Sequence, residues 1–190
     1  AYVVDARDRF VTDFVWPHLQ ANALYQGAYP LATALARPLI AQLLVEVAQR
    51  EGADAVAHGC TGKGNDQVRF DVAVHALDPG LEVVAPMRVG MGLSREQEID
   101  YAAERGIEVP ITKASPYSID VNLWGRSIET GVLEDPWTAP PADVFEWTAD
   151  PSAAPAPVEV VVAFEGGIPV AVDGQRLDPV SLVDHVSTLA

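Results

Sequence analysis

The spacing of apolar residues predicts one long helix in the first third of the chain. Between residues 29 and 50, apolar side chains recur at every fourth position, as the buried face of a helix requires. Pro38 interrupts the pattern because it has no backbone N–H to donate. It predicts either a kink near Ala34 or a new helix with Pro38 in its first turn. Gly52 supplies the residue at which the helix stops.

Short apolar runs bounded by turn residues predict the strands of a sheet. Such runs cover residues 1–4, 53–57, 81–86 and 109–112. Helical patterns separate them, and strands that alternate with helices form a parallel sheet with helices on its faces. The first part of the chain is therefore predicted to have an α/β fold.

Two further helices are predicted between these strands. The first follows the loop at residues 58–65 and ends at the turn formed by residues 78–80. The second begins at a capping box, in which Ser94 and Gln97 bond to backbone amides, and it ends at Gly106. The residues that we expect to share one side of the first helix are Val68, Val72, Ala73 and Leu77.

The sequence changes character after Ser115. Proline, tryptophan and asparagine become frequent, which predicts a stretch that is mostly loop. Two apolar runs, 158–164 and 168–172, flank a Glu-Gly-Gly turn and predict a β-hairpin, and residues 173–174 form a second turn. A final helix is predicted over residues 179–189.

The composition indicates a folded protein and limits its partners. Hydrophobic residues make up 49 % and charged residues 21 % of the chain, as in globular proteins. The formal net charge of −15 argues against nucleic-acid binding, which needs clustered Lys and Arg.

The single cysteine excludes a disulfide within the chain, and the histidines lie far apart, so we expect no metal site. Neither a secretory leader nor a bilayer-spanning run is visible, so we expect no membrane and a cytoplasmic location.

The loop at residues 58–65 carries the strongest chemical signal. It holds Gly59, Gly62 and Gly64 around Thr61 and Lys63, after a predicted buried strand and before a helix. Glycines let the backbone approach a ligand, and a helix start offers amides to an anion. The spacing fits neither a Walker A loop nor a dinucleotide fingerprint. Anion binding at the end of a strand and a purely structural turn both remain open on this pattern alone.

Three ordered segments of this sequence resemble the argininosuccinate synthase family. They are residues 29–38 (YPLATALARP), residues 58–70 (HGCTGKGNDQVRF) and residues 113–129 (KASPYSIDVNLWGRSIE). The resemblance implies a parallel-sheet nucleotide-binding domain, of the adenine nucleotide alpha-hydrolase-like, Rossmann-like class, over residues 1–114. It also implies the start of an α+β synthetase domain, which binds citrulline and aspartate, over residues 115–190.

The resemblance also implies a two-step ligation. The ureido oxygen of citrulline attacks the α-phosphate of ATP, with Mg2+, and releases pyrophosphate. The amine of aspartate then displaces AMP to give argininosuccinate, in arginine biosynthesis. Both steps need positioned anions and excluded water. The implied partners are the small molecules citrulline, aspartate and ATP, and the implied assembly is a homotetramer.

Site residues follow from the same resemblance, although none is assigned a catalytic step. The implied aspartate ligands are Thr61, Asn65 and Asp66. The implied ATP contacts are Gly59, Thr61, Asp66 and Asp120. The implied citrulline contacts are Tyr29, Asn65, Arg69, Ser118, Ser127 and Glu129.

Several of these residues also have an ordinary structural interpretation. Tyr29 could pack at a helix start, Ser118 and Ser127 could be caps or turn residues, and Asn65 or Asp66 could cap the helix. Two neighbours of the loop are interpreted as structural from the outset. His58 is expected to be a hydrogen-bonded residue rather than a base, and Cys60 a small filler rather than a nucleophile.

The sequence also departs from the family. Family members are about twice as long and open with a Ser-Gly-Gly-Leu-Asp-Thr-Ser loop that grips pyrophosphate, which does not occur here. The alternative to a ligase is therefore a truncated, non-catalytic binding or assembly relative that needs a partner chain. A different ATP-pyrophosphatase would use the same nucleotide fold, but the citrulline-side segment at residues 115–129 argues against it.

Overall fold

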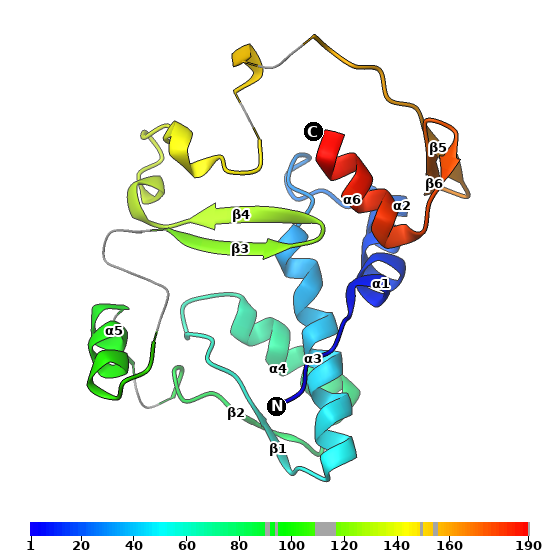
Figure 1. The fold of residues 1–190 in the computed structure, drawn as a ribbon. Helices are drawn as coiled ribbons and strands as arrows, with labels where there is room; N and C mark the ends of the chain where they lie inside the picture. The colour runs from blue at the N-terminus through cyan, green and yellow to red at the C-terminus, as the bar shows by residue number, and fades with distance from the viewer. Residues whose placement is uncertain (90–91, 94, 109–116, 149, 154–155, 190) are drawn as a thin grey trace. The chain divides into compact units, whose positions relative to one another are not determined.

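A computed structural model describes the chain except for residues 90–91, 94, 109–116, 149, 154–155 and 190 (Figure 1). The chain divides into two compact units. Unit 1 contains Ala1–Leu35 and Tyr117–Ala190, and unit 2 contains Ala36–Pro116. The predicted boundary at residue 114 lies outside the described residues, so the division into residues 1–114 and 115–190 stays a prediction.

Unit 2 is built on a parallel strand–helix–strand motif. Strand β1 (Ala55–Ala57) leads through the glycine-rich loop into α4 (Asp66–Leu77), and β2 (Glu82–Val84) pairs parallel with β1. The long helix α3 (Ala32–Glu51) supplies the other wall of the core. The parallel pairing predicted from the sequence is confirmed. The buried core residues are Ala41, Val45, Ala48, Val56, Phe70, Val74 and Leu81.

Helix α3 runs through Pro38 without a break, so of the two predicted alternatives the new helix at Pro38 is wrong. Proline cannot donate to the carbonyl one turn earlier, which weakens the helix locally. The buried residues that follow, Leu39, Ala41 and Val45, anchor the helix beyond this point. Its end is as predicted, because Gly52 adopts a φ of 64° and the Ala53 amide donates to the Ala48 carbonyl at 2.9 Å.

The apolar residues expected to share one side of α4 do not all face the core. Val68 and Val72 are 55 % and 63 % exposed, whereas Phe70 and Val74 are buried. Apolar residues lie on several sides of this helix, so periodicity alone does not select one face. Contact with the α3 residues in the core selects the side that carries Phe70 and Val74.

The last helix of unit 2 is as predicted. Helix α5 (Arg95–Glu104) ends just before Gly106, whose φ is 64°. The capping residue Ser94 and the predicted strand at residues 109–112 lie outside the described residues.

The predicted strand at residues 1–4 is wrong. These residues have no regular secondary structure, and Val3 is fully exposed. An apolar run forms a strand only beside a partner, and none pairs with it in the described part of the chain. The next residues form a helical run that the sequence did not predict. It consists of α1 (Arg7–Phe10), a π-helical turn η1 (Val11–Val15) and α2 (Trp16–Gln20).

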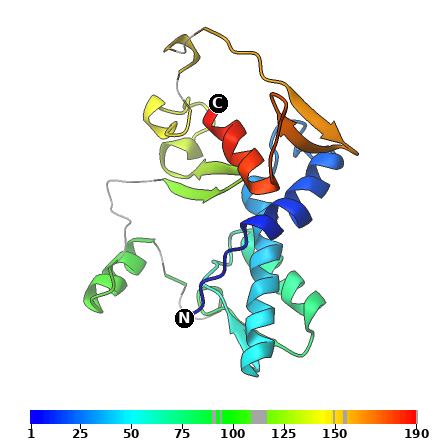
Figure 2. The ribbon, with the colours of Figure 1, turned by 45° about the vertical axis from the view of Figure 1, so that its right-hand side comes forward.

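The helical run packs against the C-terminal elements within unit 1 (Figure 2). These are the antiparallel strands β5 (Val162–Glu165), β6 (Ile168–Val172) and β7 (Gln175–Arg176), followed by α6 (Pro179–Leu189). The predicted hairpin, second turn and final helix are thus confirmed, although β5 starts four residues later than expected. The buried residues of this region include Val11, Val15, Val172, Leu182 and Val183.

A second hairpin lies where the sequence predicted mostly loop. Strands β3 (Ser118–Asn122) and β4 (Gly125–Glu129) pair antiparallel. The Asn122 side-chain oxygen accepts hydrogen bonds from the amides of Trp124 and Gly125, at 2.8 and 3.2 Å, and so closes the turn. The following stretch does contain short 3-10 turns, η2 (Gly131–Glu134), η3 (Ala142–Val144) and η4 (Pro151–Ala153).

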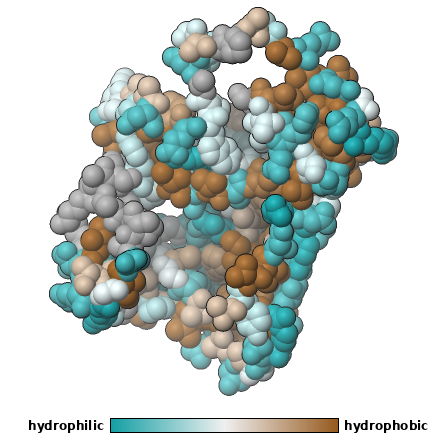
Figure 3. Space-filling model, viewed as in Figure 1, coloured by the Kyte–Doolittle hydropathy of each residue, from teal (hydrophilic) through white to brown (hydrophobic). Residues whose placement is uncertain are grey.

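Apolar side chains also remain at the surface, as the brown areas of Figure 3 show. Large exposed apolar residues occur in both units, for example Val72 in unit 2 and Trp137 in unit 1. Among the described helices, none combines the length and the apolar character that crossing a bilayer requires.

Candidate functional site

The glycine-rich loop after β1 is open. Gly59, Gly62 and Gly64 all have ordinary negative φ, so the backbone does not require glycine at these positions. A Cβ added at Gly59 would meet no atom within 4 Å. The chain's own packing thus leaves free space beside Gly59. Thr61 and Asn65 are exposed on the same loop, where a ligand could reach them.

The start of α4 is not capped by a side chain. Asn65 occupies the N-cap position but makes no side-chain capping hydrogen bond. The Asp66 carboxylate is hydrogen-bonded to arginines instead. The structural interpretation of these two residues as helix caps is therefore wrong. Uncapped amides at a helix start attract anions.

Asp66 lies between two guanidinium groups. Its carboxylate accepts a hydrogen bond from Arg37 Nε at 2.8 Å and another from Arg69 Nη1 at 2.7 Å. Partial burial alone would raise the pKa of the Asp66 carboxyl, but the hydrogen bonds and charges of the two arginines outweigh it and lower the pKa. Asp66 is therefore ionised at neutral pH, and Arg69 is held beside it.

A second ionic cluster joins the start of the loop to α4 and to the segment after β2. The Asp71 carboxylate accepts from Arg88 and contacts His58 Nε2 at 3.2 Å. Burial alone would raise the pKa of Asp71, but the hydrogen bonds from Arg88 and His58 lower it. Burial raises the pKa of the Cys60 thiol, which packs against the core. His58 is hydrogen-bonded and Cys60 packs against the core, as expected, while the absence of a chemical role for either residue stays a prediction.

The β3–β4 hairpin brings together residues that are separated in sequence. Its register sets Ser118 opposite Glu129 and Asp120 opposite Ser127. Residues directly opposite each other in antiparallel strands share a face, and alternate residues do too. All four residues therefore lie on one face of the hairpin. Because Ser118 and Ser127 are in strands, their interpretation as caps or turn residues is wrong.

Tyr29 joins this face of the hairpin. Its hydroxyl lies 2.8 Å from the Ser127 hydroxyl and 3.4 Å from that of Thr33. The Asn122 amide donates to the Ala32 carbonyl at 2.7 Å, which holds the first residue of α3 against the hairpin. Tyr29 is thus positioned by polar contacts of its hydroxyl.

The predicted residues therefore fall into two groups, each within one unit. The loop group, in unit 2, consists of Gly59, Thr61, Asn65, Asp66 and Arg69. The hairpin group, in unit 1, consists of Tyr29, Ser118, Asp120, Ser127 and Glu129.

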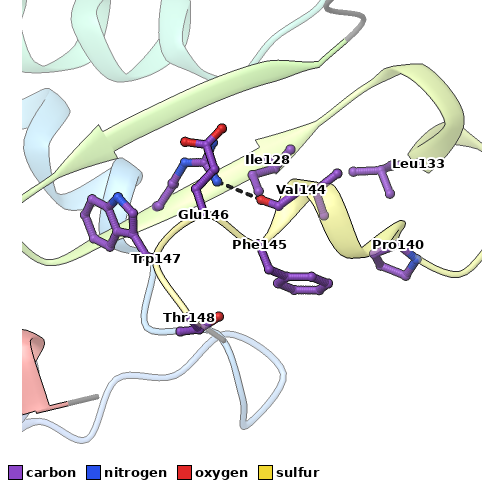
Figure 4. Close-up of a pocket in the computed structure, with 9 residues that line it drawn as sticks. Ile128, Leu133, Pro140, Val144, Phe145, Glu146, Trp147 and Thr148 are labelled. Carbon is purple, nitrogen blue, oxygen red and sulfur yellow. Dashed lines mark hydrogen bonds and ion pairs between the residues drawn. The ribbon is translucent and has the colours of Figure 1, made fainter. Parts of the chain in front are cut away.

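A cavity of about 420 Å3 lies beside the hairpin, and no local sequence pattern indicated it (Figure 4). Arg126 and Ile128 contribute to it from the face opposite to that of the hairpin group. Arg126, whose side chain is 8 % exposed, donates to the Val144 carbonyl at 2.8 Å and pairs with Glu146 at 3.1 Å. No member of the hairpin group lines it. The other lining residues are Leu133, Pro140, Phe145, Trp147 and Thr148.

Sequence reasoning missed the charged partners in unit 2. Arg37 is 29 residues from Asp66, and Arg88 is 17 residues from Asp71, so no short-range pattern links them. Across the residues that the structure describes, no three His, Cys, Asp or Glu side chains gather as metal ligands would.

Comparisons with known proteins agree with this architecture. Residues 1–108 match the model described as "Arginosuccinate synthase N-terminal HUP domain", and residues 117–190 match "Arginosuccinate synthase C-terminal domain". The first match, with the parallel strands of unit 2, confirms the predicted nucleotide-binding fold class.

Similar relatives carry the name argininosuccinate synthase. The chain is 58 % identical to the one from Symbiobacterium thermophilum and 55 % identical to one from Dehalococcoides mccartyi, with all of this chain and 47 % of each relative covered. It is 59 % identical to one from Synechococcus sp. (strain RCC307), with 99 % of this chain and 46 % of the relative covered. The chain thus spans about half the length of the curated relatives it matches. On these matches and this fold, the chain belongs to the argininosuccinate synthase family.

Proposed function

We propose that this chain forms part of an enzyme that ligates L-citrulline to L-aspartate with ATP. Citrulline oxygen attacks the α-phosphate and pyrophosphate leaves, and the aspartate amine then displaces AMP from the adenylated carbon. The observation that carries the proposal is that residues implied by the family resemblance contact one another within each unit: Arg69 donates to Asp66, and Tyr29 bonds to Ser127 on the hairpin. Positioning of this kind is what such a ligation needs.

For aspartate, we propose the loop group as the binding surface. Thr61 offers a hydroxyl and Asn65 an amide, and both are exposed. Asp66 offers a carboxylate that its arginine partners keep ionised, which suits the ammonium group of an amino acid. The uncapped start of α4 favours the negative charge of the substrate's carboxylates.

For citrulline, we propose the hairpin group. The hydroxyls of Tyr29, Ser118 and Ser127 can donate to or accept from an amino acid, and the exposed Glu129 carboxylate suits an ammonium. Asn65 and Arg69 are assigned to the same substrate by the family resemblance. Of these, Arg69 already donates to Asp66, so it would reach citrulline with its remaining donors.

For ATP, we propose contacts at Gly59, Thr61, Asp66 and Asp120. The open space beside Gly59 fits a nucleotide that approaches the backbone closely. Mg2+ would be held mainly by the phosphates, as it commonly is at nucleotide sites. By the same family resemblance, we propose a homotetramer, which analytical ultracentrifugation would test.

Isothermal titration with amino acids tests the proposal. The chain should bind L-citrulline in preference to L-ornithine, which lacks the ureido group, and L-aspartate in preference to L-glutamate. Equal affinities within each pair would contradict it.

A second assay addresses the alternative of a non-catalytic relative. The purified chain is incubated with ATP, citrulline and aspartate, and AMP and pyrophosphate are measured. Turnover by the chain alone would exclude the need for a partner chain. Citrulline binding without turnover would support that need.

A further inference from the structure

Hydrogen bonds tie the glycine-rich loop to α4 and to the segment after β2. Asp71, on α4, contacts His58 at the start of the loop and Arg88 after β2. A second set of hydrogen bonds involves Gln67, which donates to the Gly62 carbonyl at 2.7 Å and accepts from Arg88 at 3.4 Å. Both sets of hydrogen bonds therefore include a residue of the loop that carries Thr61.

The contacts of His58 determine where its ring proton lies. The Cys60 amide donates to His58 Nδ1 at 3.2 Å, so Nδ1 must carry a lone pair. The proton then lies on Nε2, which is 3.2 Å from the Asp71 carboxylate and donates to it. The His58 ring also stacks on Phe70, with the ring centres 5.5 Å apart. His58 thus transmits the position of Asp71 to the backbone of the loop.

We propose that Asp71 is a positioning residue for the substrate loop: by accepting from His58, it fixes the Nε2–H tautomer and so holds the Cys60 amide and the adjoining Thr61 in place. This role rests on the proposed function of the loop in aspartate binding. The role assigned to Asp71 is indirect, through its partners His58 and Arg88.

The substitution Asp71→Asn would test this role with almost no change in size. One side-chain oxygen would be replaced by an NH2 group, which cannot accept. If that NH2 faces His58, it donates to Nε2, and the ring proton moves to Nδ1. The Cys60 amide would then face another donor and lose its acceptor. The opposite orientation would set the NH2 group against the Arg88 guanidinium, so that two donors meet, and the Arg88 contact therefore selects the orientation in which the NH2 group faces His58.

The experiment measures the His58 tautomer and aspartate affinity in the same samples. Nitrogen-15 NMR of the ring assigns the tautomer, and titration with L-aspartate gives the affinity. In the unaltered chain we expect the Nε2–H form. In Asp71→Asn we expect the Nδ1–H form, or loss of the single tautomer, with aspartate binding weakened about tenfold. The matched control is Asp54→Asn, an exposed aspartate of the same unit, which should change neither readout.

Two histidine variants keep the proposal testable if Asp71→Asn does not fold. In His58→Asn, the side-chain oxygen can replace Nδ1 and keep the bond to Cys60, but the link to Asp71 is lost. In His58→Gln, the amide can replace Nε2–H and keep the link to Asp71, but the bond to Cys60 is lost. Because both links are needed, each variant should weaken aspartate binding about tenfold.

The outcomes separate this inference from the proposed function. If the unaltered chain binds aspartate and the Asp71→Asn or histidine variants bind it equally well, the positioning role is overturned while the proposed function stands. An Nδ1–H tautomer in the unaltered chain also overturns it. If the unaltered chain does not bind aspartate, the proposed function of the loop fails, and the positioning role fails with it.

Discussion

The loop group and the hairpin group use different physical means to hold polar side chains in place. In the loop group, ion pairs position the side chains, because the Asp66 carboxylate pairs with both Arg37 and Arg69. In the hairpin group, backbone register does so, and the contacts between side chains are neutral, as between Tyr29 and Ser127. The difference indicates that the loop depends on charge and the hairpin on strand pairing, so single substitutions should affect the loop more.

The largest effect is expected from Asp66→Ala. It removes the carboxylate from two arginines and deletes the proposed partner of the aspartate ammonium. We expect aspartate affinity to fall about 100-fold and the free energy of unfolding to fall by about 1–3 kcal/mol. Titration with L-aspartate measures the affinity, and urea unfolding measures the free energy of unfolding. Asp54→Ala, at an exposed aspartate of the same unit, is the control. Unchanged affinity would mean that ion pairing at the loop serves the fold alone.

Val74→Ala should have the next largest effect, because Val74 packs α4, the helix that follows the loop, into the core of unit 2. Val74 is 1 % exposed, so removing two methyl groups leaves a cavity and should cost about 2 kcal/mol of unfolding free energy. Val72→Ala is a control on the same helix, at a residue that is 63 % exposed, and should cost less than about 0.5 kcal/mol. Equal costs in urea unfolding would contradict the observed orientation of α4.

Tyr29→Phe should have a smaller effect, in the hairpin group. It removes the hydroxyl that bonds to Ser127 at 2.8 Å and keeps the ring. We expect citrulline affinity to fall about tenfold and aspartate affinity to stay unchanged. Tyr25→Phe is the matched control, since Tyr25 is exposed and pairs with Tyr29 only through the backbone. A loss of aspartate affinity in Tyr29→Phe would show that the two groups do not divide the substrates.

The smallest effect is expected from lowering the pH, which should reduce the free energy of unfolding through Asp66 and Asp71. Burial opposes ionisation of Asp66 and Asp71, but their arginine hydrogen bonds prevail, so both folded pKa values lie below the ordinary 3.8. A lowered folded pKa adds stability that is fully present above the unfolded pKa, about 3.9, and is lost as pH falls through the folded pKa. Unfolding free energy should therefore drop below about pH 4, and less steeply in Asp66→Asn. Carboxyl titrations by NMR with midpoints above 3.8 would refute the account.

Local patterns predicted much of the fold, and they failed where tertiary contacts decide. Helix α3 follows from periodicity, and Gly52 and Gly106 mark the ends of α3 and α5. The first helical run was missed because its buried residues form two adjacent pairs, five positions apart across a π-helical turn, rather than a stripe that recurs over several helical turns. These residues are Phe10, Val11, Val15 and Trp16.

The two groups also differ in how far the sequence alone predicted them. Glycines after a strand mark the loop by a physical rule, since the carboxyl end of a parallel strand is where ligands bind. Ser118 and Ser127 were identified only by family resemblance, because nothing local showed that β3 and β4 would pair. Arg37, Asp71 and Arg88 were missed altogether, since charged partners that are distant in sequence meet only after the chain folds.

The most direct test of the division between the two groups is amide chemical-shift mapping of the chain with each amino acid in turn. We predict that L-aspartate shifts the amides of residues 59–66 and leaves those of residues 118–129 unchanged. We predict that L-citrulline shifts the amides of residues 118–129. Aspartate-induced shifts in the hairpin, or a hairpin that does not respond to citrulline, would contradict the account.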